Sequence, residues 1–215
     1  MPKVKGARIG KVTKVENAHA GWKAKVEIRR LVLEALTPDR AVVFDAFAGP
    51  GLMYSEVWQH ASRYVGCDEK WHRDDRCCYV ADNRRVMRCT DLQPFNCFDL
   101  DAYGSPWEQA LILAARRPLQ PGERIGLVLT EGTSLYTRFS QVPHAMRQAA
   151  GLLPAVSLGA GRMHDDLIAR ALRGIARRMR GRVVKEWRAM GVSGAQMRYL
   201  GVIVEGLRTS RSDGG

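Results

Sequence analysis

The sequence predicts an α/β fold, a three-layer sandwich in which helices cover both faces of a mostly parallel seven-stranded sheet ending in an antiparallel hairpin. Two observations lead to this prediction. Short apolar runs typical of strands alternate with longer segments of helical periodicity, as parallel sheets require. The last two runs follow one another across a short glycine-containing loop, as in a hairpin. The length of 215 residues, with 46% hydrophobic and 26% charged residues, fits one globular domain.

Apolar spacing and the positions of proline and glycine predict the first elements of the chain. A helix is expected over residues 22–36, because apolar residues recur there at helical spacing and Pro38 disfavours helix in the residue before it. The apolar run at 41–47 fits a strand that is buried on both faces. A Gly-Pro-Gly turn at 49–51 follows, and the next helix is expected over 52–61.

The same alternation continues to the end of the chain. The later helices are expected at 107–117 and 165–179. The later strands are expected at 63–67, 85–89, 96–100, 124–130, 183–190 and 198–204. The last two of these strands form the predicted hairpin.

Positive charge is concentrated in two segments. The chain has 34 Lys and Arg against 22 Asp and Glu, a net charge of +12, and residues 1–30 and 162–182 together account for all of it. This distribution favours a polyanionic partner, with nucleic acid first and an anionic membrane second. We divide the chain into a basic N-terminal arm at 1–20, the domain at 21–207 and a flexible tail at 208–215.

No segment is typical of a membrane span or a signal peptide. The longest uncharged apolar stretch, 149–161, has 13 residues and contains a proline. The five cysteines include no C-x-x-C pair, so reduced thiols in a cytoplasmic protein are the simplest interpretation. The alternative is a zinc site at Cys67, His72 and Cys77, but their spacing matches no standard ligand pattern, and we expect no metal.

Acidic residues and glycines stand at the expected carboxyl ends of the strands, where open α/β sheets bind ligands. The first strand runs into D-A-F-A-G-P-G at 45–51, whose glycines allow close approach of a ligand to the backbone. The second strand delivers Asp68, 17 residues after Gly51, where nucleoside-binding folds place a ribose-binding acid. Asp91 and Asp101 end the third and fourth strands.

Two classes of nucleoside cofactor compete for this arrangement. A dinucleotide fingerprint requires a third glycine where this chain has the bulky Tyr54, which disfavours a pyrophosphate site. Asp45 at the end of the first strand also favours a cationic ligand over an anionic one. The residues therefore favour a nucleoside cofactor without phosphate.

The motifs D-x-F-x-G-x-G at 45–51 and D-x-x-G-S-P at 101–106, with an acid at the second strand end, resemble class I S-adenosylmethionine-dependent methyltransferases over about residues 40–205. The resemblance implies a Rossmann-like sheet and S-adenosyl-L-methionine as cofactor. It places the first motif near the methionine part, Asp68 at the ribose and Asp91 near the adenine. The implied cofactor-binding residues are Asp45, Phe47, Gly49, Pro50, Gly51, Asp68, Glu69 and Asp91.

The segment 99–107, D-L-D-A-Y-G-S-P-W, holds the catalytic candidates. The lone pair of an exocyclic amine is delocalised into its ring, so the amine is a poor nucleophile until hydrogen bonds localise that pair. Asp101 can accept an N–H from such an amine and stabilise the developing charge. Tyr103 can stack on the base. Asp99 is a further catalytic candidate, with the alternative that it only caps the turn.

The motif D-L-D-A-Y-G-S-P at 99–106 resembles the D-x-D-P-F/Y-G-S-P motif of the tRNA guanosine N2-dimethyltransferase family, with Ala102 in place of the proline. The strand and turn at 127–133 are also similar to that family. The resemblance implies an N-methyltransferase acting on guanine N2 of RNA or DNA. Two alternatives stay open: a same-fold enzyme for a protein or small-molecule amine, and a non-catalytic nucleic-acid-binding module.

Several residues are expected to contact the substrate. Four arginines step by three or four residues along one face of the helix that begins at 165. Three of them have no acidic residue at helical spacing, which favours phosphate contacts over a solvated face. Residues 71–73 are expected to form a wall of the substrate or adenine site. The predicted substrate-binding residues are Pro106, Trp107, Arg170, Arg173, Arg177 and Arg180.

Overall fold

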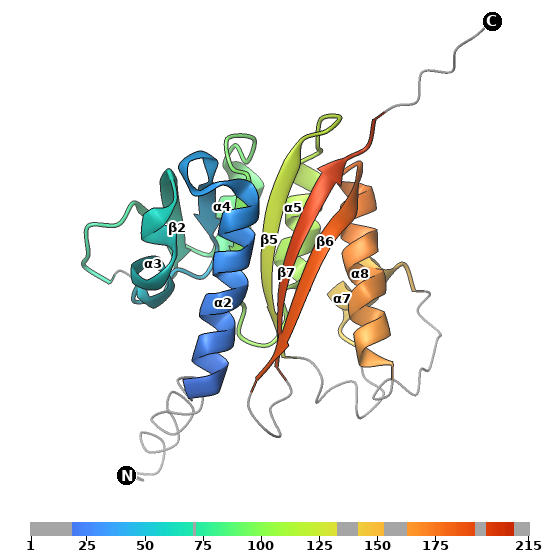
Figure 1. Ribbon diagram of the computed structural model, residues 1–215, viewed down its shortest axis with the longest axis horizontal. Helices are drawn as coiled ribbons and strands as arrows, with labels where there is room; N and C mark the ends of the chain where they lie inside the picture. The colour runs from blue at the N-terminus through green and yellow to red at the C-terminus, as the bar shows by residue number, and fades with distance from the viewer. Residues whose placement is uncertain (1–18, 71, 133–141, 153–162, 192–196, 209–215) are drawn as a thin grey trace, which may run out of the picture.

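The structure, a computed structural model, describes residues 19–70, 72–132, 142–152, 163–191 and 197–208 (Figure 1). The predicted arm at 1–20 lies outside the described residues except for 19 and 20, which begin a helix. The predicted tail at 208–215 lies outside them except for residue 208, and Trp71 is also outside.

The described residues form one seven-stranded sheet in the order β3-β2-β1-β4-β5-β7-β6. Strand β7 is antiparallel to both of its neighbours, and the other pairs are parallel. The predicted sheet, with its antiparallel C-terminal hairpin, is therefore confirmed. The strands are β1 Val42–Asp45, β2 Arg63–Asp68, β3 Cys78–Val80, β4 Cys97–Leu100, β5 Arg124–Glu131, β6 Gly181–Met190 and β7 Arg198–Gly206.

Helices cover both faces of the sheet, and each face has its own hydrophobic core. On one face α2 lies across β5 and β7 (Figure 1), with Val32 packing near Val128 and Ile203. On the other face α4, α5, α7 and α8 bury Phe98 and Leu127. The helices are α2 His19–Leu36, α3 Leu52–Glu56, α4 Asn83–Cys89, α5 Trp107–Arg116, α7 His144–Ala150 and α8 His164–Arg178, with 3-10 turns η1 Pro38–Arg40 and η2 Trp58–His60.

The third strand is not where the sequence predicts it. Residues 85–89 belong to helix α4, whose first turn is capped by Asp82, which accepts the Arg84 amide at 2.8 Å. Val86 and Met87 point into the core from this helix. The third strand is β3, which has three residues and lies at the sheet edge with largely exposed side chains, so it carries no alternating apolar pattern.

Smaller differences leave the architecture unchanged. The predicted helix at 52–61 divides into α3 and η2, because Val57 between them has non-helical dihedrals of −137° and −56°. Helix α7 was not predicted. Among the described residues, none of the helices is long and apolar enough to cross a membrane.

Candidate active site

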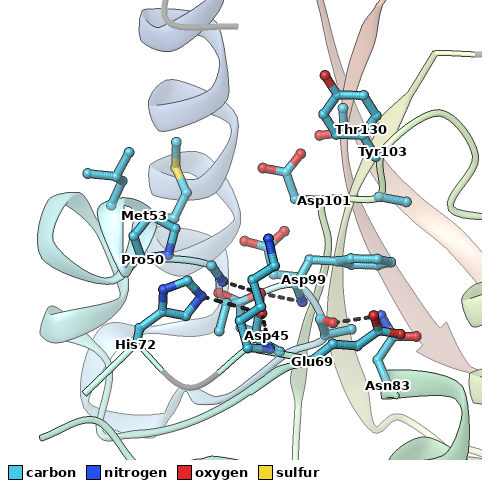
Figure 2. Close-up of a pocket in the computed structure, with 18 of the residues that line it drawn as sticks. Asp45, Pro50, Met53, Glu69, His72, Asn83, Asp99, Asp101, Tyr103 and Thr130 are labelled. Carbon is cyan, nitrogen blue, oxygen red and sulfur yellow. Dashed lines mark hydrogen bonds and ion pairs between the residues drawn. The ribbon is translucent and has the colours of Figure 1, made fainter. Parts of the chain in front are cut away.

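A cavity of about 670 Å³ opens at the carboxyl ends of β1, β2 and β4 (Figure 2). Its walls come from the loops that follow these strands and from helices α2 and α3. Parallel strands present their carboxyl ends at one edge, so predicted residues far apart in the sequence meet there. The predicted residues that line it are Asp45, Phe47, Gly49, Pro50, Asp68, Glu69, Asp99, Asp101 and Tyr103.

The loop after β1 is held in a conformation that only glycine adopts easily. Gly49 and Gly51 have φ angles of 46° and 85°. Gly49 lines the cavity, whereas Gly51 does not and instead faces Arg76, which lies 2.9 Å from where a Cβ of residue 51 would stand. Gly51 therefore shapes the loop, and Gly49 exposes backbone to the cavity.

Arg76, which the sequence analysis did not single out, fixes this loop from behind. Its guanidinium donates to the carbonyl oxygens of Ala48 at 3.0 Å and Gly49 at 2.7 Å. Asp74 in turn pairs with Arg76 at 2.6 Å. The carbonyls that Arg76 binds are 28 and 27 residues away, so no local pattern predicts the contact.

Asp68 stands at the end of β2 and joins the loops after β1 and β2. Its Oδ2 accepts the Gly49 amide at 3.0 Å and its Oδ1 accepts the Lys70 amide at 2.7 Å. His72 lies 3.4 Å from Oδ1 and also lines the cavity. A carboxylate has about four acceptor positions, so Asp68 keeps room for two more donors. The neighbouring Glu69 is exposed and has no hydrogen-bonding partner among the described residues.

Asn83, and not Asp91, stands at the end of the third strand. Asn83 lines the cavity, donates to the Ala46 carbonyl at 2.9 Å and accepts from Gln109 at 3.1 Å. Asp91 follows helix α4 at the opposite end of the sheet, where it is exposed and accepts the Gln93 amide at 2.9 Å. The prediction that Asp91 ends a strand near the adenine is therefore wrong.

Asp99 lies at the floor of the cavity in a buried ion pair. Arg29 of α2 donates to it twice, from Nε to Oδ2 at 2.6 Å and from Nη2 to Oδ1 at 2.9 Å. The indole of Trp58 donates to Oδ2 at 2.8 Å. All three side chains are buried. Both oxygens of Asp99 are therefore engaged, which gives Asp99 a structural role in this arrangement.

Asp101 differs from Asp99 because its carboxylate reaches the cavity (Figure 2). Its Oδ2 lies 3.1 Å from Lys25 Nζ and 3.1 Å from Arg29 Nη2. The Thr130 side chain also hydrogen-bonds to this carboxylate. Burial alone would raise the pKa of Asp101, but the charges of Arg29 and Lys25 outweigh it and lower the pKa below its ordinary value. Asp101 is therefore charged at neutral pH.

The charges around the cavity floor do not balance when every group is ionised. Asp45, Asp99 and Asp101 face only Lys25 and Arg29 within this cluster. Burial, together with the charge of Asp99, raises the pKa of Asp45 to about 8. Burial also raises the pKa of Asp99, but Arg29 and Trp58 bind that carboxylate directly. A cationic ligand group beside Asp45 would favour the ionisation of Asp45.

Tyr103 and Thr130 lie beside Asp101 (Figure 2). The Tyr103 ring is 74% exposed at the mouth of the cavity, where a planar ligand can stack on it. Thr130 is fully buried, and its side chain is one of the groups that lower the pKa of Asp101. Thr130 therefore helps to hold the Asp101 carboxylate in its charged form.

Two predicted substrate contacts are wrong. Trp107 is fully buried in the core beneath α5, and Pro106 is buried at the start of that helix. Neither lines the cavity. The sequence pattern could not distinguish them from exposed residues, because Pro-Trp after a turn fits both a helix start and a substrate wall.

The predicted arginines do not reach this cavity. Arg170, Arg173 and Arg177 are exposed on α8 and line a separate groove at the far edge of the sheet. Arg180 lies beyond the helix end with a φ angle of 60° and does not line that groove. No group of three or more His, Cys, Asp or Glu that could hold a metal occurs among the described residues.

Comparison with known proteins identifies the fold. No protein-family model matches the chain, and no curated protein has a similar sequence. The structure of Trm1 from Pyrococcus horikoshii with S-adenosyl-L-methionine has a TM-score of 0.57 at 17% identity, covering 88% of this chain and 56% of that one. The chain thus spans little more than half of that structure.

Two further methyltransferase structures are similar to this chain. The N-methyltransferase NodS from Bradyrhizobium japonicum WM9, in complex with S-adenosyl-L-homocysteine, has a TM-score of 0.54 at 10% identity, covering 91% of each chain. TYW2 from M. jannaschii with AdoMet has a TM-score of 0.52 at 13% identity, covering 86% of this chain and 77% of that one. The chain therefore has the fold of the class I S-adenosylmethionine-dependent methyltransferases.

Proposed function

We propose that this chain is an S-adenosylmethionine-dependent N-methyltransferase that methylates the exocyclic amine of guanine, N2, in nucleic acid. One observation carries the proposal. The carboxylate of Asp101 faces a ligand-sized cavity at the carboxyl ends of the strands, is kept ionised by Lys25 and Arg29, and lies beside the exposed ring of Tyr103.

The residues of the cavity fit S-adenosyl-L-methionine, which supplies an electrophilic methyl group on a sulfonium when bound. Asp45 has no cation in contact with it, which suits the ammonium of the methionine part. Gly49 exposes its backbone at a positive φ angle. Asp68 and Glu69 offer carboxylate oxygens to the ribose hydroxyls, and Asn83 offers a polar group to the adenine edge. The comparison structures with this cofactor support the same assignment.

Asp101 would act on the substrate amine through the carboxylate oxygen that does not face Lys25 and Arg29. Oδ1 accepts one N–H of the amine, which concentrates the lone pair on nitrogen, while Lys25 and Arg29 hold Oδ2. Accepting the methyl group would leave a positive charge on this nitrogen, while the sulfonium would become a neutral thioether. Because the pKa of Asp101 is low, this carboxylate stabilises that charge first, and the proton leaves to solvent after the methyl transfer.

The substrate class is supported by the motif at 99–106 and by the basic segments of the chain. A guanine that stacks on Tyr103 would have to be single-stranded or flipped out of a duplex, because its N2 must reach Asp101. The alternatives are a small-molecule or protein amine in the same cavity.

The test is incubation of the purified chain with isotopically labelled cofactor and separate pools of tRNA, rRNA, DNA and protein, followed by mass spectrometry of the digested products. We expect label in N2-methylated guanosine, and none when the Asp101→Asn chain replaces the wild type. Label only in protein or in a small amine would overturn the nucleic-acid assignment. Binding of NAD without binding of S-adenosylmethionine would overturn the methyltransferase assignment.

A further inference from the structure

A second groove, of about 690 Å³, lies between helix α8 and the edge strand β6. We call it the α8–β6 groove. Arg170, Arg173 and Arg177 line it from the helix, and Arg182 lines it from the strand. Figure 1 shows α8 alongside β6, at the opposite edge of the sheet from α3 and β2. The groove is therefore distinct from the candidate active site.

Arg170, Arg173 and Arg177 make no contact that stabilises the described part of the fold. Spacings of three and four residues place them on one face of α8, and all three are exposed. Within the described residues they have no ion pair and no side-chain hydrogen bond. Arg178 of the same helix is different, because it donates to the carbonyl of Gln148 at 2.7 Å and to that of Gly174 at 3.1 Å.

The groove also lacks a free acid that would neutralise these charges. Glu186 is the acidic residue that lines it, and Glu186 pairs with Arg188. Arg182 of the edge strand β6 pairs with Glu205 of the neighbouring strand β7 at 3.4 Å. Like charges at helical spacing repel one another, so an anionic partner would stabilise this face of α8.

Uncharged residues line the groove between the arginines. They include Ala169, Leu172, Ala176, Gly181 and Val183. None of these side chains can pair with an arginine, so a phosphodiester can lie between the guanidinium groups. From Arg170 to Arg177 the helix rises roughly 10 Å, about the axial rise of three nucleotides in one strand.

We propose that the α8–β6 groove binds the phosphate backbone of the nucleic-acid substrate at a distance from the methylated base. The proposal rests on the proposed function for the identity of the substrate. Helix α8 begins at His164, which contacts Glu131 at 2.6 Å, next to Thr130 of the candidate active site. From there α8 leads away from the active-site end of the sheet. A substrate that occupies both sites must therefore be an extended strand or a folded RNA, not a nucleoside.

Nucleic acid fits the groove better than an anionic membrane does. The site is concave and its arginines follow one line, whereas membrane-surface helices present a broad apolar face between basic residues. The apolar residues of α8, such as Leu172 and Ile175, are buried in the core instead. Binding to anionic vesicles is accordingly an outcome that would contradict the proposal.

The test compares two triple variants that lose the same charge. The groove variant is Arg170→Gln, Arg173→Gln and Arg177→Gln. The control variant is Arg40→Gln, Arg63→Gln and Arg85→Gln, three exposed arginines without ion pairs among the described residues. Binding of fluorescein-labelled oligouridine and of a labelled RNA duplex is measured by anisotropy over a range of NaCl concentrations.

We expect the groove variant to lower the slope of log affinity against log salt by about 2–3, at roughly 0.7–0.9 per lost phosphate contact. The control should keep the wild-type slope, and a groove variant with lysines in place of the arginines should keep most of it. Equal losses in both glutamine variants would overturn the proposal. So would groove-dependent binding to phosphatidylserine vesicles without such binding to RNA.

Calorimetry with S-adenosyl-L-homocysteine separates this proposal from the proposed function. We expect both triple variants to bind this compound as the wild type does, because none of the six arginines lines the candidate active site. If the wild type binds RNA through the groove but does not bind S-adenosyl-L-homocysteine, the methyltransferase proposal fails and the groove proposal stands.

Discussion

Lys25 and Asp101 are 76 residues apart in the sequence and form an ion pair of 3.1 Å at the wall of the candidate active site. Arg29, one helical turn after Lys25, lies 3.1 Å from the same oxygen of Asp101 and also binds Asp99. Helix α2 thus brings two cations to the end of β4. Its position on the sheet controls the charge of the carboxylate that we assign to catalysis.

Asp101→Asn should remove most methyl transfer while leaving cofactor affinity nearly unchanged. The amide keeps the shape of the side chain but lacks the charge that stabilises a cationic amine, so we expect a loss of about 10²–10⁴-fold in rate. Single-turnover kinetics at saturating cofactor measures this. Near wild-type rates in the variant would move the catalytic role away from Asp101.

Tyr103 should affect substrate affinity more than the chemical step. Tyr103→Ala removes the stacking surface at the cavity mouth and should weaken substrate binding by roughly 1–3 kcal/mol. Tyr103→Phe keeps the ring face and is the matched control, with most of the affinity retained. Equilibrium binding of the identified substrate checks both. A phenylalanine variant as weak as the alanine variant would show that the hydroxyl, not the ring, is needed.

Lys25→Met should shift the pH dependence of the reaction. Lys25 helps to lower the pKa of Asp101, so its removal raises that pKa and the protonated, inactive form persists to higher pH. We expect the acidic limb of the rate profile to move to higher pH. Lys23→Met, on an exposed position of the same helix, should leave the profile in place. Identical profiles for both variants would contradict this role of Lys25.

Arg29→Met should destabilise the fold by about 3–5 kcal/mol, because it leaves Asp99 buried without its cation. Urea unfolding measures the loss. The double variant Arg29→Met, Asp99→Leu removes both charges and should be more stable than Arg29→Met alone. Arg30→Met is the control, since Arg30 is exposed and lies 3.9 Å from Glu56, and it should change stability by less than about 0.5 kcal/mol.

Cofactor binding should release a proton from Asp45. Its pKa of about 8 in the free protein is raised by burial, so at pH 7 most molecules must lose this proton to pair with the cofactor ammonium. The affinity should therefore fall as the pH drops below about 8, by at most about tenfold per unit. Calorimetry in buffers of different ionisation enthalpy counts the protons. An affinity independent of pH between about 6 and 8 would contradict this assignment.

The raised pKa of Asp45 also makes the stability of the protein depend on pH. The folded-state pKa of Asp45 lies above the ordinary value of an aspartate, so the folded state binds more protons between about pH 4 and pH 8, and stability falls as the pH rises through that range. Asp45→Asn removes this term and should stabilise the protein above about pH 8, by about 1–3 kcal/mol. The same variant should bind the cofactor more weakly, so the two readouts move in opposite directions.

The sequence by itself determined the fold class, most of the elements and the edge of the sheet that holds the site. These features depend on local patterns: apolar runs, helical periodicity, and glycines or acids where strands end. For this reason the residues at 45–50, Asp68, Asp101 and Tyr103 line one cavity. The local pattern was too weak to predict β3, a three-residue edge strand with largely exposed side chains. Because the third strand was predicted at 85–89 instead, Asp91 was wrongly placed at its end.

The tertiary structure alone decided which partner each charged group has. Arg29 takes Asp99, Lys25 takes Asp101, and Asn83 stands where Asp91 was predicted. It also buried Trp107 in the core. These outcomes depend on contacts between residues tens of positions apart, whose geometry follows from how the helices pack on the sheet. A sequence pattern shows which side of a helix or strand faces the core. The packing of α2 on the sheet sets the distances from Arg29 and Lys25 to the two carboxylates, and these distances distinguish the structural Asp99 from Asp101 in the cavity.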